Sequence, residues 1–227
     1  MAKLIMTKES GCITKIKNIS KPDVTFIILA GGKSKKMKDY SNRSILKIKH
    51  KTIAEHQIEE IRKHYPEAEI IFVLGYDADK VYEEIKKFDV KSIYLNHFIT
   101  FQSYQAVLYG VRACTNKKVF VLHNDILLNE QVFNFKHNES TIILTNKKKD
   151  AVGVITQDDY VTSITYGVKN YWQKIIYLTE QPLKIMRDMI VDRENWNKFD
   201  WELYNELSDS CQIRCHYADL VEINTGR

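Results

Sequence analysis

The sequence predicts an α/β protein with a Rossmann-like, three-layer α/β/α fold and a mostly parallel central sheet. Short, nearly continuous apolar runs recur in the first half, as strands buried on both faces require. Segments with apolar residues at helical spacing separate these runs, and this alternation is typical of a parallel sheet covered by helices. The 227 residues fit one domain, and 44% of them are hydrophobic, which is enough to bury a sizeable core.

Each element of the first half follows from one of these two patterns. The predicted strands are residues 24–30, 69–74, 91–95 and 118–122, and the predicted helices are residues 53–64, 77–87 and 102–114. Pro66 ends the first helix, and Asp77 is the expected N-cap of the second. Right-handed crossovers would then place the strands parallel, with ligands beyond their carboxyl ends.

The second half is patterned differently, with shorter apolar runs separated by polar turns. Its predicted strands are residues 141–144, 152–155, 161–165, 172–178, 212–216 and 220–223, with helices at 182–190 and 200–207. Mixed or antiparallel pairing of these strands would extend the sheet and cover the site. We expect a single domain over residues 1–227, with a first half (24–128), a second half (129–227) and an N-terminal extension (1–23).

Composition excludes several classes of protein. The net charge of +5, with no compact basic stripe, argues against a nucleic-acid partner. No apolar run has the roughly 20 residues of a membrane span, and the N-terminus lacks the apolar centre of a signal peptide. The four cysteines have no disulfide or zinc spacing, which fits a reducing compartment. We therefore expect a cytoplasmic protein with neither a membrane nor a nucleic-acid partner.

The first predicted strand runs directly into Leu-Ala-Gly-Gly-Lys-Ser-Lys-Lys-Met, residues 29–37. The two glycines, Gly31 and Gly32, allow a sharp bend and close approach of the backbone to a ligand. Successive N–H groups in such a turn bind anions, and three lysines add positive charge. The spacing is neither a Walker A loop nor GxGxxG. On this loop alone, a phosphate cradle and a plain structural turn with exposed lysines remain equally open.

The loop and the residues after it resemble a family of nucleotidyltransferases. The family includes sugar-nucleotide pyrophosphorylases, molybdenum-cofactor guanylyltransferases and phosphocholine cytidylyltransferases, and it opens with Leu-Ala-Gly-Gly-x-Gly/Ser-x-Arg-Met. Residues 29–37 match this pattern with Lys36 at the arginine place. Residues 42–47 stand where Pro-Lys-x-Leu occurs, with Arg43 at the lysine place, and the resemblance continues to about residue 128. Lys36 and Arg43 are thus implied as the catalytic cations on the triphosphate.

The resemblance also implies which residues contact the nucleotide. Residues 96–103 occupy the segment that reads the base in this family, although Ser103 could instead cap the next helix. Lys47 and Lys174 are weaker candidates for the phosphate of the acceptor. The implied nucleotide-binding residues are Leu29, Ala30, Gly31, Gly32, Lys33, Ser34, Gln102 and Ser103.

A Mg²⁺ site is implied at the end of the fourth predicted strand. The family places Gly-Asp there, and Asp125 matches with Asn124 at the glycine place. A carboxylate at a strand end that faces a phosphate cradle suits a hard cation, although a loop or cap role for Asp125 stays open. The second implied ligand is Asn224, and Glu222 is expected on the other face of its strand.

The implied reaction is Mg²⁺-dependent transfer of a nucleotidyl group from an NTP to a phosphorylated sugar or small alcohol, with release of pyrophosphate. Because Lys36 and Arg43 exchange the family's arginine and lysine, a nucleotide-binding member with impaired turnover is an alternative. A metal-dependent glycosyltransferase is another, although its usual Asp-x-Asp is replaced here by residues 123–125, with one carboxylate. A structural adaptor without nucleotide binding is a third. The base and the acceptor are left open.

Overall fold

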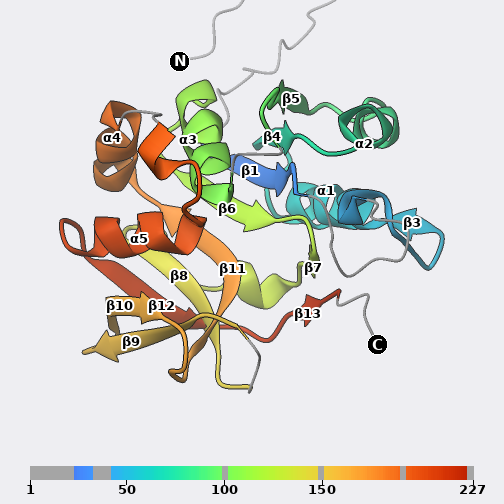
Figure 1. Ribbon diagram of the computed structural model, residues 1–227. Coiled ribbons are helices and arrows are strands. Elements are labelled where there is room, and N and C mark those ends of the chain that lie inside the picture. The colour runs from blue at the N-terminus through green and yellow to red at the C-terminus, as the bar shows by residue number, and fades with distance from the viewer. Residues whose placement is uncertain (1–22, 33–41, 99–101, 148–150, 190–192, 224–227) are drawn as a thin grey trace, which may run out of the picture.

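The computed structural model describes residues 23–32, 42–98, 102–147, 151–189 and 193–223. A nine-stranded sheet in the order β5-β4-β1-β6-β11-β8-β12-β10-β9 runs through the molecule, with helices packed on its faces (Figure 1). Its strands are β1 (Thr25–Ala30), β4 (Glu69–Leu74), β5 (Lys91–Tyr94), β6 (Val119–His123), β8 (Ser140–Thr145), β9 (Gly153–Gln157), β10 (Tyr160–Thr165), β11 (Tyr171–Leu178) and β12 (Ile213–Tyr217). The helices are α1 (Ile53–His64), α2 (Ala78–Ile85), α3 (Ser103–Ala113), α4 (Glu180–Asp188) and α5 (Asp200–Ser208).

The first half forms the parallel part of this sheet, as predicted. Strands β5, β4, β1 and β6 are neighbours in that order, and all three pairings are parallel. Ala30 at the end of β1 pairs with Leu74 of β4, and Leu29 pairs with His123 of β6. The carboxyl ends of these three strands therefore lie side by side.

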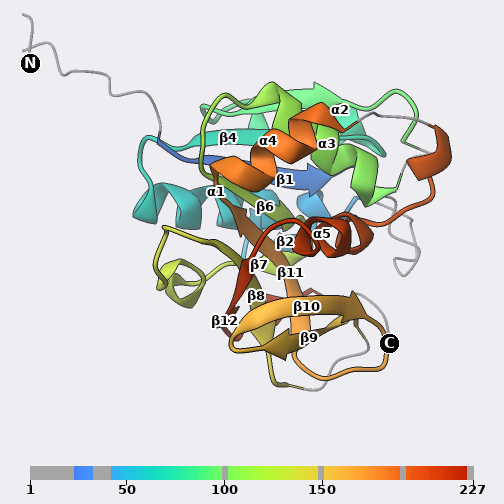
Figure 2. The same cartoon turned by 90° about the vertical axis from the view of Figure 1, so that its left-hand side faces the viewer.

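Helices cover both faces of the parallel part. Phe26 and Ile28 of β1 belong to the core cluster that includes α1 and α2, whereas Ile27 and Leu29 belong to the cluster under α3, α4 and α5. Figure 2 shows α1 on one side of β1 and β4, with α3 and α4 on the other. Because neighbouring residues of a strand point to opposite faces, one continuous apolar run serves both layers.

The helix ends explain where α1 and α2 begin. Thr52 and Glu55 form a capping box at the start of α1, so that helix begins where the apolar periodicity predicts. Asp77 does precede α2, but its backbone is left-handed (φ 54°) and its side chain makes no capping hydrogen bond. Asp77 is therefore the N-cap residue of α2 as predicted, but it occupies that position without a side-chain capping hydrogen bond.

The second half corrects the expectation of a mostly parallel sheet. Strands β11, β8, β12, β10 and β9 pair in that order, and β9 also pairs with β11, which closes the five strands into a ring. Within this ring only β8 and β12 are parallel. Asp158 and Asp159, both left-handed, form the two-residue connection between β9 and β10, and so short a turn joins only antiparallel strands.

Short elements near the strand ends escaped the sequence prediction, apart from the strand predicted at residues 220–223. Two-residue strands pair as β2 (Lys47–Ile48) with β3 (Lys51–Thr52), and as β7 (Ile126–Leu127) with β13 (Val221–Glu222). Residues 1–22 of the expected extension lie outside the described residues. In the described part of the chain, every helix is too short or too polar to cross a bilayer.

Candidate active site

Buried side-chain amides tie the loop before β2 to the strand ends. Asn42, which is fully buried, donates to the Ala30 carbonyl (2.6 Å) and to a carbonyl that follows β4 (2.9 Å). The Asn124 amide, just after β6, donates to Asn42 Oδ1 and Ser44 Oγ, both at 2.8 Å. A buried amide with all these partners fixes its surroundings, because any lost bond leaves a buried polar group unpaired. Arg43, between the two bonded residues, is thereby held at the carboxyl edge of the sheet.

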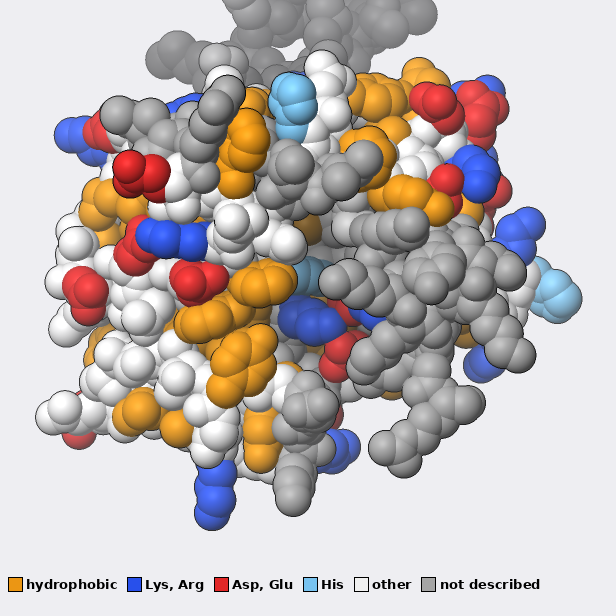
Figure 3. All heavy atoms as spheres, in the orientation of Figure 1, with side chains coloured by type: hydrophobic (Ala, Val, Ile, Leu, Met, Phe, Trp, Pro, Cys, Tyr) orange, Lys and Arg blue, Asp and Glu red, His pale blue; other side chains and the backbone are white. Residues whose placement is uncertain are grey.

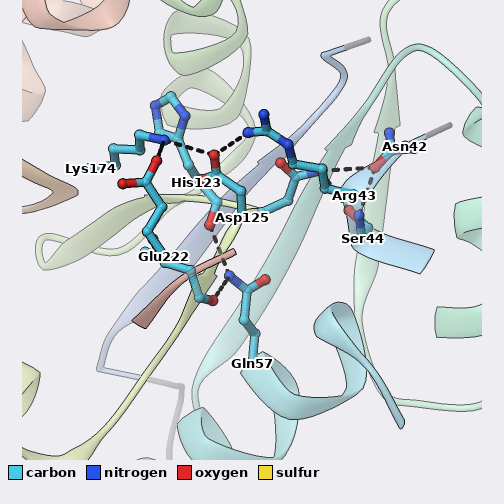
Figure 4. A network of polar contacts seen from close by, with 10 residues as sticks. Asn42, Arg43, Ser44, Gln57, His123, Asp125, Lys174 and Glu222 are labelled. Atoms are coloured by element: carbon cyan, nitrogen blue, oxygen red, sulfur yellow. Dashed lines mark hydrogen bonds and ion pairs between the residues drawn. The ribbon is translucent and has the colours of Figure 1, made fainter. Parts of the chain in front are cut away.

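Four charged side chains, Arg43, Asp125, Lys174 and Glu222, meet at this edge and are called here the charged cluster (Figure 4). Arg43 Nη1 donates to Asp125 Oδ2, and Lys174 Nζ donates to the same oxygen at 2.7 Å. Lys174 Nζ also donates to Glu222. Figure 3 shows acidic and basic side chains together in a hollow near the middle of one face, with hydrophobic side chains along its edge.

A β-bulge in β11 aims Lys174 into the cluster. Lys174 has a left-handed backbone (φ 59°), and the pairing of β11 with β8 shifts register between Trp172 and Ile176. The preceding residue, Gln173, anchors the bulge because its amide donates to the Ala218 carbonyl at 3.1 Å. Such a conformation costs a non-glycine residue on the order of 1–3 kcal/mol. Strain of this kind next to a charged hollow indicates a functional side chain.

The turn that carries Asp125 is held from two further elements. Gln57 of α1 is buried, and its amide donates to the carbonyls of His123 (2.8 Å) and Ile126 (3.0 Å). The Ile223 N–H, just after β13, donates to the Asp125 carbonyl at 2.7 Å. The Asp125 carboxylate is consequently fixed by its backbone as well as by its ion pairs.

The electrostatics keep the cluster ionised. Burial alone would raise the pKa of Asp125, but Lys174, His123 and Arg43 outweigh it and lower that pKa below its ordinary value. Burial would likewise lower the pKa of Lys174, but Asp125 and Glu222 raise it. Buried ion pairs contribute little to net stability because both charges lose water. Their presence at a strand end therefore favours a functional role.

Asp125 fits the implied Mg²⁺. Its Oδ1 atom is buried and has no hydrogen-bond partner among the described residues. Mg²⁺ in proteins is bound by one or two carboxylates together with waters and substrate phosphates, so a single free carboxylate oxygen is a suitable ligand. The described ranges contain no group of three or more His, Cys, Asp or Glu side chains that could hold a metal.

The second implied ligand, Asn224, lies outside the described residues. Two positions earlier, Glu222 does not point away as expected, because its carboxylate reaches Lys174 inside the cluster. Residues two apart in a strand share a face, so the expectation for Glu222 was wrong in its geometry.

The predicted phosphate loop is described only at its start. The side chains of Leu29 and Ala30 are buried in the core, so these residues offer only backbone groups to a ligand. Gly31 and Gly32 follow directly after β1, whereas Lys33, Ser34 and Lys36 lie outside the described residues.

A close backbone approach fixes the direction in which this loop leaves the sheet. The Tyr76 N–H donates to the Gly31 carbonyl at 3.0 Å. A Cβ atom on Gly75 would come within 2.7 Å of that carbonyl and of Phe98 Cβ. Only glycine leaves room at position 75 for the loop after β1 to pass.

The residues implied in base recognition lie at the start of α3. Gln102 has an exposed side chain and occupies the N-cap position, so the alternative that Ser103 is the cap is wrong. Ser103 instead donates its hydroxyl hydrogen to Asp200 Oδ1 at 2.7 Å. Lys47 is exposed in β2, where it pairs with Thr52 of β3, and it is not a member of the charged cluster.

Several residues of the site were not found from the sequence. Asn124 lies just after the fourth predicted strand, which is a signal that could have found it, whereas Asn42 lies 12 positions after its partner Ala30. Gln57 and Asp200 have no such signal, because each lies on a helix far along the chain from its partners.

The fold and the charged cluster define an α/β protein with the architecture of nucleotidyltransferases. The chain belongs to the MobA-like NTP transferase domain family, whose model matches residues 26–190. A curated relative, the bifunctional protein GlmU of Caldicellulosiruptor saccharolyticus, is 30% identical over 104 residues, which is 45% of this chain and 22% of that protein. This bears out the resemblance drawn from the sequence.

Solved structures share the fold over most of the chain. The CTP:phosphocholine cytidylyltransferase from Streptococcus pneumoniae has a TM-score of 0.72 at 14% identity, covering 88% of this chain and 93% of its own. The inositol-1-phosphate CTP transferase from T. maritima has a TM-score of 0.72 at 13% identity, covering 91% of each chain. HddC from Yersinia pseudotuberculosis, complexed with GMP-PN, has a TM-score of 0.68 at 19% identity, covering 89% of this chain and 94% of its own.

Proposed function

We propose that this protein is a Mg²⁺-dependent nucleotidyltransferase that joins an NTP to a phosphorylated sugar or small alcohol and releases pyrophosphate. The observation that carries the proposal is the charged cluster. Arg43, Asp125 and Lys174 come from three separate segments and meet where parallel strands end. In open α/β sheets this edge is where ligands bind.

In the proposed reaction an oxygen of the acceptor phosphate attacks the α-phosphorus of the NTP. The new P–O bond forms as the bond from the α-phosphorus to the bridging oxygen breaks, and pyrophosphate leaves with that electron pair. No protein nucleophile is needed, so the protein acts by positioning and by stabilising charge. Bound Mg²⁺ would supply further neutralisation of phosphate charge, with Asp125 as its ligand and Asn224 as a second.

Different groups of the protein would bind different phosphates of the two substrates. Lys36 and the N–H groups of Gly31 and Gly32 would bind the β- and γ-phosphates, as in other anion-binding turns. Arg43 would turn from Asp125 to the leaving pyrophosphate, because its planar guanidinium can bind two phosphate oxygens at once. Lys174, a point charge aimed by its bulge, would bind the acceptor phosphate.

Proposed specificity follows from the same division. Gln102 and Ser103, at the start of α3, would face the base from residues 24–128. The acceptor would lie against residues 129–227, beside the ring of five strands. The hydrophobic side chains along the hollow (Figure 3) suit the carbon skeleton of a small acceptor.

Pyrophosphate release tests the proposal. Each of five nucleotides (ATP, CTP, GTP, UTP and dTTP) is incubated with Mg²⁺ and a panel of phosphorylated sugars and alcohols. We expect release with at least one pair, and its loss in Asp125→Asn. Nucleotide binding without release from any pair would favour a member with impaired turnover. Transfer of a sugar from a nucleotide-sugar, without pyrophosphate exchange, would instead favour a glycosyltransferase.

A further inference from the structure

A second polar network lies beside the charged cluster, and of its three side chains only Ser103 has a role assigned above. It is centred on Asp200, whose Oδ1 accepts from Ser103 Oγ (2.7 Å) and whose Oδ2 lies 2.8 Å from His123 Nε2. The Asp200 N–H in turn donates to Ser103 Oγ at 2.9 Å. Ser103 opens α3, His123 ends β6 and Asp200 opens α5, so one carboxylate joins three elements that are far apart in sequence.

Asp200 is not needed to cap its own helix. The first turn of α5 is already closed by Glu202, whose carboxylate accepts from the Phe199 N–H at 2.7 Å. Asp200 is 2% exposed, and burying an ionised carboxylate is costly unless it is paired. Both oxygens of its carboxylate bond to residues of α3 and β6, which indicates that Asp200 positions these two elements at the site.

His123 is the member of this network that lies next to the charged cluster. Its ring meets the ring of Trp172 edge-on, at 88° and 5.8 Å between centroids. Its side chain keeps 23% of its surface exposed, and among the described residues nothing hydrogen-bonds its other ring nitrogen. Figure 4 shows the imidazole close to Lys174 and Asp125. One ring nitrogen is thus fixed by Asp200, while the other can meet a ligand that Lys174 also binds.

Charge supports this geometry. Around the ring stand Asp200 from α5, Asp125 from the turn after β6 and Lys174 from β11. An anionic phosphate next to Lys174 completes this set of charges.

We propose that Asp200 is a positioning residue for nucleotidyl transfer, which holds His123 as a further ligand of the acceptor phosphate and holds Ser103 at the nucleotide side. This inference rests on the proposed function. The ligand that His123 takes is a phosphomonoester. Asp200 fixes both the start of α3, where the base is expected, and His123, where the acceptor phosphate is expected. The positions of the base and of the acceptor phosphate are therefore coupled.

Steady-state kinetics on the full chain separate the role of His123 from that of Ser103. The substrates are the NTP and the acceptor that the panel identifies. Loss of a hydrogen bond to a charged group weakens binding roughly 10–100-fold. His123→Gln should raise the acceptor KM about tenfold and leave the NTP KM within about twofold. Ser103→Ala should raise the NTP KM by less than about tenfold and leave the acceptor KM within about twofold. Asp200→Asn should raise both KM values and lower kcat about tenfold.

Glu202→Ala is the matched control, because it removes a contact in the same turn of α5 and leaves every bond of Asp200 in place. Its two KM values should stay within about twofold of the parent protein. Should Glu202→Ala reproduce the kinetics of Asp200→Asn, Asp200 merely supports the helix and the inference is wrong. If Asp200→Asn fails to fold, His123→Gln and Ser103→Ala still decide, and an unchanged acceptor KM in His123→Gln overturns the inference.

A binding experiment judges the inference without turnover. The protein is saturated with a non-hydrolysable NTP analogue, and inorganic phosphate is titrated as the probe. We expect phosphate to shift the ¹⁵N signals of the His123 ring, and His123→Gln and Asp200→Asn to weaken phosphate binding about tenfold while Ser103→Ala does not. Equal phosphate affinity in His123→Gln would refute the inference even if pyrophosphate is released. Absence of release from every pair would instead count against the proposed function.

Discussion

The two halves of the molecule bring their side chains to the site by different routes. In residues 24–128, β1, β4 and β6 are parallel, so the segments that follow them meet at one edge without any distortion of the strands. In the second half, Lys174 comes from inside β11, where the backbone is left-handed and the pairing with β8 shifts. Topology gathers the first set of residues, and local strain places the second.

The register of β11 explains why strain is needed. Strand β11 runs antiparallel to β6 and pairs Ile175 with Leu122, so Lys174 lies level with the carboxyl end of β6. An antiparallel strand enters the site region by its middle rather than by its end. A residue there normally points to one of the two packed faces, and a bulge is what redirects it into the hollow.

Removing the shared anion should produce the largest effect. Asp125→Asn keeps the size of the side chain but leaves Arg43 and Lys174 without their common counter-charge. We expect turnover to fall on the order of 10²–10³-fold, because a preorganised electrostatic group is lost. Pyrophosphate release is measured below the melting temperature of the variant. Glu59→Gln, which alters an exposed ion pair with Lys51, is the control and should retain full activity. Equal turnover in Asp125→Asn would remove Asp125 from the machinery.

The contrast between strand ends and the β11 bulge also explains which site residues the sequence can predict. Arg43 and Asp125 were implied by the resemblance, and Asp125 lies just after a strand that the apolar pattern predicts. Lys174 was only a weak candidate, because a bulge has no apolar pattern of its own. Glu222 was placed on the wrong face, and Asp200 was not considered, since its partners lie 77 and 97 positions away. Contacts at such separations depend on the packing of α5, which local patterns do not encode.

The parallel half should be sensitive to volume at its loop crossing. In Gly75→Ala the new methyl group meets the Gly31 carbonyl and Phe98 Cβ, each at 2.7 Å, so the loop after β1 must shift. We expect the free energy of unfolding to fall by about 1–3 kcal/mol, as for other overpacked positions. Urea denaturation measures this loss. Gly32→Ala, whose new Cβ has no atom of the described residues within 4 Å, should unfold at the parental urea concentration. If both variants unfold alike, the crossing is not tightly packed.

The second half should respond to backbone strain instead. Lys174→Gly and Lys174→Ala both remove the ammonium group and should lower turnover equally. The glycine variant should be more stable than the alanine variant by about 1 kcal/mol, because glycine adopts the left-handed backbone without a Cβ penalty. Thermal melting of the two variants measures the difference. A more stable alanine variant would mean that position 174 is not strained.

The fold shows the same division between pattern and packing. Helix α1 and strand β4 have the bounds that their periodicity predicts, because each buries a face against the same sheet. The second-half strands were located to within a few residues, but their partners were not. Closure of β9 onto β11 through Tyr171 and Gly153 joins segments that no apolar pattern distinguishes from other short strands.

The smallest expected effect lies where the two halves pack together. His137 stands among Phe120 of β6, Phe135 and Tyr177 of β11, and its Nε2 atom lies 3.2 Å from the Tyr65 hydroxyl. Burial, with a further contribution from Lys118, lowers its pKa below the ordinary value of 6.5. The folded protein therefore binds fewer protons here than the unfolded chain.

This contribution to stability is present above about pH 6.5 and is lost as the pH falls through the lowered pKa. His137→Phe should therefore lose less stability than the parent protein between pH 7.5 and 5.5, measured as the urea midpoint. The pKa of His123 is shifted upward, but that residue is present in both proteins, so the difference between them isolates His137. An identical loss in both proteins would mean that His137 is as solvated when folded as when unfolded. The contact between the halves would then be looser at this position than the packing of Phe120 and Tyr177 implies.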